Sequence, residues 1–148
     1  MSEEITLKPI SKRDVHRLET ALMVATLLRP DVLEKIREPS ERLTWLDSLA
    51  VAAGALARSR AGYTVMRIAD ELGRSEATIR NHIRGKTEAG RLVLETYERF
   101  VREGIKIELP TEVERRDKEI EELRIKLKSY EEKLLAIKRR LEEILAMI

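Results

Sequence analysis

Apolar side chains recur every three or four positions over most of this chain, which is the spacing of one buried face of an α-helix. The pattern predicts helices over about residues 11–29, 30–36, 40–62, 65–72, 76–84, 87–102 and 111–148. The third of these helices should turn inward a face made of Leu43, Leu46, Leu49, Ala53 and Leu56. Only residues 105–109 alternate between apolar and charged, which predicts a short strand that could pair with Ile5 and Leu7. We therefore expect an all-α fold.

The last predicted helix carries a strict seven-residue repeat. Apart from Arg116 at the first d position, apolar residues occupy the a and d positions of about five heptads, the seam along which helices pair in coiled coils. The predicted dimerisation residues are Val113, Ile120, Leu123, Leu127, Tyr130, Leu134, Ile137, Leu141 and Ile144. A single helix cannot bury such a stripe alone, so we expect a homodimer. Packing of the stripe against the N-terminal helices, or against another protein, is the alternative.

Charges beside this seam bear on the direction of the second helix. In a parallel pair, two flanking contacts attract and two repel, whereas an antiparallel pair with Leu127 opposite Tyr130 has three attractive contacts and one repulsive contact. Exposed ion pairs contribute only about a few tenths of a kcal/mol each, so both directions stay open. An antiparallel coil would separate the two N-terminal parts and favour DNA bridging.

Composition limits the classes of protein to which the chain can belong. The 148 residues include 29 Lys and Arg and 27 Asp and Glu, for a net charge of +2, but residues 58–91 hold 8 basic and 4 acidic side chains. The absence of cysteine excludes disulfides, Fe–S clusters and thiolate zinc sites. No apolar run approaches the roughly 20 residues that cross a bilayer, and the N-terminus lacks a signal-peptide pattern. We expect a cytoplasmic protein without membrane contact.

The basic block contains the pattern that two short helices joined by a tight turn require, a helix-turn-helix. Ala69 is small where a second helix would cross closely, and Gly73 suits the left-handed conformation of the turn. Ser75 can cap the next helix. Ile79 and Ile83, four residues apart, give that helix a buried stripe.

The face of helix 76–84 opposite this stripe has the chemistry that reads bases in the major groove. Arg can donate two hydrogen bonds to guanine, and Asn, which occurs once in the chain, can pair with adenine. We expect Thr78, Arg80, Asn81 and Arg84 to contact bases. We expect the surrounding Arg58, Arg60, Arg67, Arg74, Ser75 and Lys86 to contact phosphates. Plain helical packing with ordinary surface arginines is the alternative, and the ordered motif and the charge block together favour DNA.

Residues 68–83 resemble the helix-turn-helix of LuxR-type and related bacterial and archaeal regulators, in which a glycine turn is followed by Ser-Glu-x-Thr, an apolar residue and a His. The residues that match this order are Ser75, Glu76, Thr78, Ile79 and His82. Arg74 departs from it, because an apolar residue is usual there. Over about residues 43–104 the chain also resembles an archaeal probable regulatory domain family encoded beside KaiC-like ATPases. That likeness implies a transcription or signalling role and a KaiC-like ATPase as a partner.

No arrangement of catalytic or metal-binding residues stands out. Gly85-Lys86-Thr87 resembles the end of a phosphate-binding loop, but the earlier glycine is missing and the segment follows a helix. His16 and His82 lack an acidic cluster at matching spacing, so we expect no metal and no cofactor. His82 should serve packing or a phosphate contact, and Trp45 should belong to the core. We expect a protein that is not an enzyme.

Together these observations predict a transcriptional regulator that binds double-stranded DNA and dimerises through its C-terminal coiled coil. Residues 1–39 form an N-terminal helical segment, 40–104 the helix-turn-helix domain, 105–110 a linker or short strand and 111–148 the coil. A chromatin-type architectural protein with little sequence preference is the first alternative. An adaptor of a KaiC-like ATPase is the second.

Overall fold

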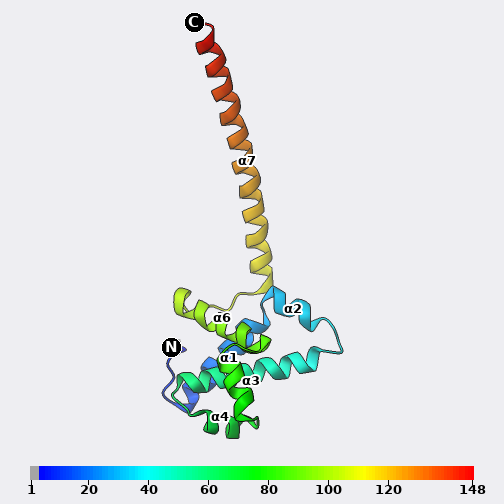
Figure 1. Cartoon of the computed structure of the whole chain (residues 1–148), viewed down its shortest axis with the longest axis vertical. Coiled ribbons are helices and arrows are strands. Elements are labelled where there is room, and N and C mark those ends of the chain that lie inside the picture. The colour runs from blue at the N-terminus through cyan, green and yellow to red at the C-terminus, as the bar shows by residue number, and fades with distance from the viewer. Residues whose placement is uncertain (1–3) are drawn as a thin grey trace. The chain divides into compact units, whose positions relative to one another are not determined.

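The computed structural model describes residues 4–148, except for the side chains of residues 110, 112 and 113. The described residues form seven helices and no strand, which confirms the all-α fold (Figure 1). The helices are α1 (Lys12–Leu27), α2 (Pro30–Ile36), α3 (Arg42–Arg60), α4 (Val65–Leu72), α5 (Glu76–Ile83), α6 (Glu88–Glu103) and α7 (Pro110–Ala146). The chain divides into two compact units on either side of Leu109. We call residues 4–108 the head.

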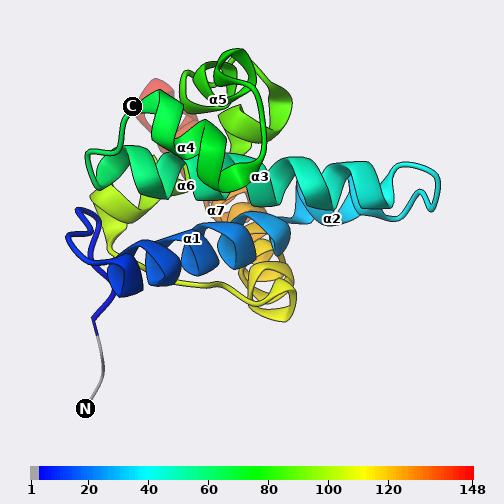
Figure 2. The same cartoon turned by 90° about the horizontal axis from the view of Figure 1, so that it is seen from below.

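Helix α3 is the centre of the head. Every residue from Val51 to Arg58 is buried, and most of them are alanine or glycine. Small side chains lose little rotamer freedom on burial and let neighbouring helices approach closely. As a result α1 packs along one side of α3, and α4 and α5 pack along the other (Figure 2).

A first hydrophobic cluster joins α1, α3 and α6. Its members are Val15, Leu18, Ala21, Leu22, Ala25, Val32, Leu49, Ala52, Ala53, Leu56, Ala57, Ala89, Leu92, Val93, Tyr97 and Phe100. Two buried hydroxyls cross it, because Thr26 donates to Thr96 (2.8 Å) and Thr96 donates in turn to the Leu92 carbonyl (3.0 Å). Both hydroxyls therefore have partners away from water.

Four helices of the head begin at a side chain that accepts a backbone N–H. Ser11 and Asp14 form a reciprocal capping box at the start of α1. The side chains of Thr64, Ser75 and Thr87 accept N–H groups in the first turns of α4, α5 and α6. These caps place the boundaries of the head helices close to their predicted positions.

The start of α3 was predicted wrongly. We expected Pro39 and Ser40 to begin the helix, but it begins at Arg42 and has no side-chain cap. Leu43, expected to point inward, is 79% exposed, and burial of α3 starts only at Leu49. In the first two turns of α3, Trp45, Leu46 and Ser48 are half-buried and the other residues are exposed.

The strand predicted for residues 105–109 is also wrong, since these residues have no strand conformation. The neighbours were placed correctly, because Ile5, Leu7 and Ile105 all pack against the first cluster. The Leu7 carbonyl accepts a hydrogen bond from the Tyr97 hydroxyl (3.0 Å) rather than from a neighbouring strand. Side-chain packing on α6 therefore replaces the strand ladder.

The second unit is α7, one continuous helix that begins at Pro110 rather than at the predicted cap Thr111. Every described member of the heptad stripe is exposed, from 47% for Ile120 to 66% for Leu134. The side chain of Val113, also predicted in the stripe, lies outside the described residues. Within residues 4–148, no helix combines the length and the apolar character needed to cross a bilayer.

Candidate nucleic-acid interface

The turn between α4 and α5 has the geometry that its glycine predicted. Gly73 follows α4 with φ 64° and ψ 39°, the left-handed region that glycine adopts without steric cost. The N–H of Arg74 donates to the Ala69 carbonyl (3.1 Å) and closes the turn. Helix α5 starts directly after Ser75, whose hydroxyl accepts the N–H of Thr78 (3.2 Å). These bonds fix the direction in which α5 leaves the turn.

A second hydrophobic cluster holds α5 against the head. It consists of Val51 and Ala55 from α3, Ile68 and Ala69 from α4, and Ile79 from α5. Ile79 is fully buried, and Ile83 packs at the edge of the cluster, as the predicted stripe required. Burial of a side chain of this size contributes about 1.5–3 kcal/mol.

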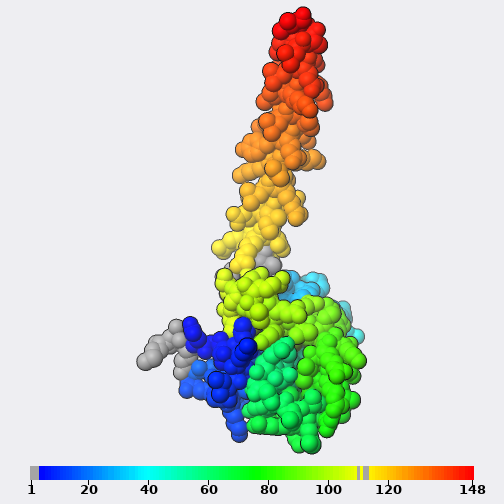
Figure 3. Space-filling model, turned by 60° about the vertical axis from the view of Figure 1, so that its left-hand side comes forward, coloured from blue at the N-terminus to red at the C-terminus, as the bar shows by residue number. Residues whose placement is uncertain are grey.

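The opposite side of α5 is open. Arg80, Asn81 and Arg84 are exposed, and Thr78 is half-buried beside its cap. The segment that includes α4 and α5, coloured green, lies at the surface (Figure 3). Arg80 pairs with Glu76 one turn earlier (2.8 Å). Among the residues that the structure describes, no hydrogen bond or ion pair occupies the side chains of Asn81 and Arg84.

Arg58 does not belong to this surface, which corrects its prediction as a phosphate contact. Its side chain lies in the buried middle of α3, and the residue is only 7% exposed. The guanidinium donates to Glu71 (2.9 Å), Glu19 (3.1 Å) and the Gly54 carbonyl (3.0 Å), so it joins α1, α3 and α4. The hydrogen bond from Arg58 helps to hold the pKa of Glu71 below its ordinary value.

Arg60 and Arg67, also predicted as phosphate contacts, are exposed and lie over aromatic rings. The guanidinium of Arg60 is 4.7 Å from the ring centre of Tyr97, and that of Arg67 is 3.6 Å from the ring centre of Tyr63. Arg67 also pairs with Glu71 (3.2 Å). Such contacts orient an exposed guanidinium. Because solvent screens them, breaking them costs little free energy.

The remaining predicted phosphate contacts lie close to α5 in sequence. Arg74 binds both carboxylate oxygens of Asp47 (2.9 and 3.0 Å). Ser75 is exposed, but its hydroxyl is used as the helix cap. Lys86 is exposed just after α5, and no ion pair occupies it within the described part of the chain.

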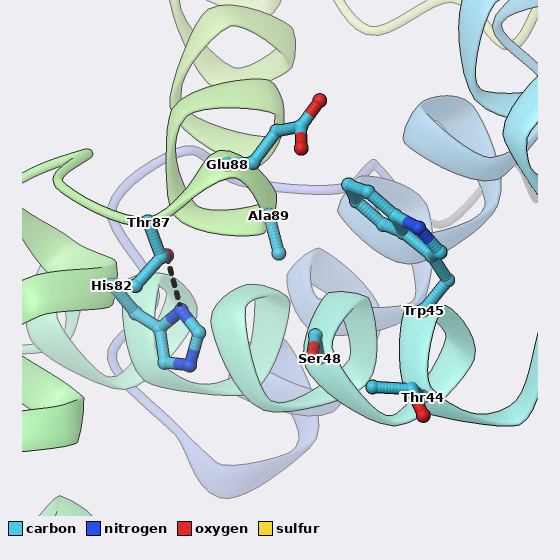
Figure 4. A pocket seen from close by; sticks show the side chains of 7 residues that line it. All are labelled: Thr44, Trp45, Ser48, His82, Thr87, Glu88 and Ala89. Atoms are coloured by element: carbon cyan, nitrogen blue, oxygen red, sulfur yellow. Dashed lines mark hydrogen bonds between the residues drawn. The ribbon is translucent and has the colours of Figure 1, made fainter. Parts of the chain in front are cut away.

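His82 faces the other flank of α5, beside a cavity of about 270 Å³ (Figure 4). The lining residues are Thr44, Trp45, Ser48, His82, Thr87, Glu88 and Ala89. His82 is 8% exposed, and its Nδ1 lies 2.7 Å from the Thr87 hydroxyl, which accepts the Gly90 N–H (3.0 Å). Nδ1 and the hydroxyl thus share one hydrogen bond, whose donor depends on the tautomer of the imidazole. Burial, reinforced by the charge of Arg74, lowers the pKa of His82, so the ring packs as a neutral group.

Trp45 is half-buried at the rim of the first cluster rather than enclosed in it. Its ring lines the cavity in Figure 4, and the Lys35 ammonium lies 4.9 Å from the ring centre. The indole thus packs on the core with one side and remains accessible on the other.

The last turn of α5 touches the first turn of α6 without any intervening side chain. A Cβ on Gly90 would lie 2.4 Å from the His82 carbonyl oxygen and 2.8 Å from the His82 Cα. Any other residue at position 90 would push the two helices apart. The C-terminal end of α5 is therefore positioned by backbone contact with α6.

The sequence reasoning missed the acidic partners of the basic residues. Glu71 follows Arg67 by one turn, a spacing that signals a helical ion pair. Glu19 lies 39 residues from Arg58, and Asp47 lies 27 residues from Arg74, so no local sequence pattern predicts these pairs.

Comparison with known proteins finds a close relative of unassigned activity. The chain is 49% identical over 148 residues to the uncharacterized protein MJ1053 of Methanocaldococcus jannaschii, a match that covers 96% of the chain and 88% of that protein. Neither a protein-family model nor a solved structure matches the chain.

Proposed function

We propose that this chain, which belongs to the same family as MJ1053, is a DNA-binding transcriptional regulator that dimerises through α7. Helix α5 would enter the major groove, with Arg80, Asn81 and Arg84 toward the base edges. Thr78 lies beside them on the first turn of α5.

The observation that carries the proposal is the two-sided character of α5. One side is anchored through Ile79 in the second cluster. The other side offers Asn81 and Arg84, whose side chains have no partner among the described residues. A helix that is held rigidly and presents unpaired amide and guanidinium groups has what base readout requires.

Phosphate contacts would come from residues around α5 and not from Arg58. Lys86 is exposed and unpaired within residues 4–148. Arg67 and Arg74 are held by Glu71 and Asp47 in exposed ion pairs. Exposed pairs of this kind contribute only about 0–1 kcal/mol, so a phosphate can replace the carboxylate at small cost.

A mobility-shift assay with genomic fragments at two salt concentrations tests the proposal. The variant Arg80→Ala/Asn81→Ala/Arg84→Ala should lose sequence preference and most affinity. The double variant Arg37→Ala/Arg102→Ala removes the same charge from exposed positions on other helices and should bind as the unmodified protein does. Unchanged binding by the triple variant would overturn the proposed readout.

The same assay separates the alternatives. Equal affinity for all duplexes, with a steep salt dependence, would identify a sequence-independent architectural protein. No binding at low salt would point to an adaptor, and capture of a KaiC-like ATPase would then support that role.

Single substitutions sharpen the distinction between base and phosphate contacts. Arg84→Ala should cost roughly 1–3 kcal/mol on the preferred sequence and little elsewhere. Lys86→Ala should weaken binding to all sequences alike and reduce the salt slope by about 1. Fluorescence-anisotropy titrations on preferred and scrambled duplexes measure both effects, and an equal loss on both duplexes for Arg84→Ala would contradict its assignment.

A further inference from the structure

The heptad stripe of α7 is a long apolar surface that its own unit leaves uncovered. Its described members from Ile120 to Ile148 are all exposed, none by less than 47%. Contiguous apolar patches above a few hundred Å² are rare on monomers, so this stripe requires a partner. The spacing of a and d positions fits a helix with the same spacing, and a second copy of α7 supplies one.

The residues in the seam favour an antiparallel partner. In a parallel pair each seam residue meets its own copy, so Arg116 would face Arg116 in the seam and Tyr130 would face Tyr130. In an antiparallel pair with Leu127 opposite Tyr130, Arg116 faces Leu141 near the end of the coil. A cation there can extend its charged end into water, and two cations are no longer brought together.

The flanking charges select the same arrangement. The attractive pairs are Asp117–Lys138, Glu119–Arg140 and Arg124–Glu131, and the repulsive pair is Lys126–Lys133. Each pair occurs twice in a symmetric dimer, so the net gain is four attractive contacts. The parallel pair has no net gain, because its attractive and repulsive contacts are equal in number.

Neighbouring antiparallel registers are much poorer. Sliding the second copy by one heptad, so that Leu127 faces Ile137, makes every pair of charged flanking residues repulsive. Those pairs are Arg124–Lys138, Lys126–Arg140, Glu131–Glu131 and Lys133–Lys133. The opposite slide, with Leu127 facing Leu123, sets Arg124 and Lys126 against their own copies and leaves Ile144 without an opposing residue in α7.

The length of the helix supports this register independently of the charges. With Leu127 opposite Tyr130, Thr111 faces Ala146 of the second copy. Two helices spanning Pro110–Ala146 therefore overlap from end to end. The register chosen by charge is thus also the one that covers the whole stripe.

We propose that α7 pairs with a second copy of itself in this antiparallel register, and that the dimer joins two separate duplex segments. Each head is attached at the N-terminal end of its α7, so the attachment points lie at opposite ends of the coil, about 55 Å apart. Half-sites on one duplex lie about 34 Å or a multiple of that distance apart, and heads attached at opposite ends of the coil can instead each engage a separate duplex. The bridging activity rests on the proposed function, whereas the geometry of the coil does not.

Disulfide crosslinking of the full chain tests the register directly, because the protein has no native cysteine. A mixture of Ile120→Cys and Ile137→Cys variants should form a mixed disulfide, since these residues face each other. Each variant alone should stay unlinked, because its two copies lie about 25 Å apart along the coil. Efficient self-linkage of either variant, or no linkage in the mixture, would overturn the register. A mass of four chains in sedimentation would overturn the two-stranded form.

A charge exchange provides a second test of orientation. Arg140→Glu should weaken dimerisation about tenfold, because it faces Glu119 only in the antiparallel register. Adding Glu119→Lys should restore it. In a parallel coil Arg140 faces Leu145, and Glu119→Lys would instead oppose Arg124, so rescue would not occur. Arg139→Glu, at an outward position, is the matched control and should leave dimerisation nearly unchanged.

Bridging is measured with one immobilised duplex and a second, fluorescent duplex of mixed sequence. The full chain should retain the fluorescent duplex, and Arg140→Glu should lose that retention at a concentration where single-duplex binding persists. Binding without retention would overturn bridging alone. Failure to bind any duplex would overturn the proposed function, while the crosslinking pattern would still report on the coil.

Discussion

The head buries, fully or partly, most of its large apolar side chains within its own fold, whereas α7 exposes all of its described ones. Phe100 and Leu18 are fully buried in the first cluster, and not one described residue of α7 is buried. The stability of the head is therefore intramolecular and independent of protein concentration. Under the proposed pairing, the stability of α7 would depend on association and vary with concentration.

The charged residues differ between the two regions in the same way. In the head, Arg58 binds Glu19 and Glu71 on two other helices. In α7, the ion pair Lys138–Glu142 lies within one turn of the same helix (4.0 Å). The ion pairs of Arg58 therefore join different helices of the head, whereas the Lys138–Glu142 pair joins residues of one helix.

The largest effect should follow from a cavity in the head. Phe100→Ala should lower the free energy of unfolding of the head by about 3–5 kcal/mol, because it removes a fully buried ring. Val101→Ala, at the exposed neighbouring position, is the control. Chemical denaturation followed by Trp45 fluorescence measures both. Equal losses for the two variants would contradict the first cluster as the source of stability.

Removal of the buried cation should come next. Arg58→Met should destabilise the head by about 3 kcal/mol, because it leaves two carboxylates without their shared partner. Arg60→Met changes an exposed arginine two residues away and should have little effect. Thermal unfolding reports the difference. If Arg58→Met instead left stability intact and reduced DNA binding, the original assignment of Arg58 to phosphate contact would be reinstated.

A substitution in the stripe should affect association and leave the head unchanged. Leu127→Lys should cost about 2 kcal/mol of dimer stability for each substituted side chain. Ile125→Lys provides the control, because Ile125 is similarly exposed but lies on the face of α7 away from the seam. Sedimentation equilibrium measures the dissociation constant. Similar weakening by both variants would show that the seam is not the interface.

The smallest effect concerns pH. His82 has a lowered pKa in the folded head, so the unfolded chain binds its proton more readily. The stability due to neutral His82 is thus complete above the ordinary histidine pKa of about 6.5 and declines as the pH falls toward the folded value. His82→Gln should flatten this decline in melting temperatures measured between pH 8 and about pH 5. The pKa values of Glu71 and Glu95 are lowered from 4.5, so their titration falls below this window.

Local chemistry explains how much of the molecule could be predicted from the sequence. Gly73, Ser75 and the Ile79–Ile83 stripe each act within a few residues, so the turn, the cap and the outward face of α5 followed directly from their order. The helix boundaries set by Ser11 and Thr87 followed for the same reason.

Apart from the start of α3, the failures depend on contacts between distant segments. Arg58 looked like a phosphate contact because it lies in a basic block, and only the fold brings Glu19 and Glu71 to it. Leu43 fits the helical period of α3, but its side chain is exposed, whereas Trp45 on the same turn packs against the first cluster. Residues 105–109 do alternate between apolar and charged side chains, but the Leu7 carbonyl accepts a hydrogen bond from the Tyr97 hydroxyl instead of from a neighbouring strand.

The position of α3 between the two clusters has a consequence for how the head unfolds. Ala53 and Leu56 belong to the first cluster, and Val51 and Ala55, on the same helical turns, belong to the second. Neither cluster can lose order without exposing one side of the helix that the other needs. The head should therefore melt in a single calorimetric transition. The backbone amides of the α5 residues that are buried beside α3 should exchange with solvent deuterium only through global unfolding of the head.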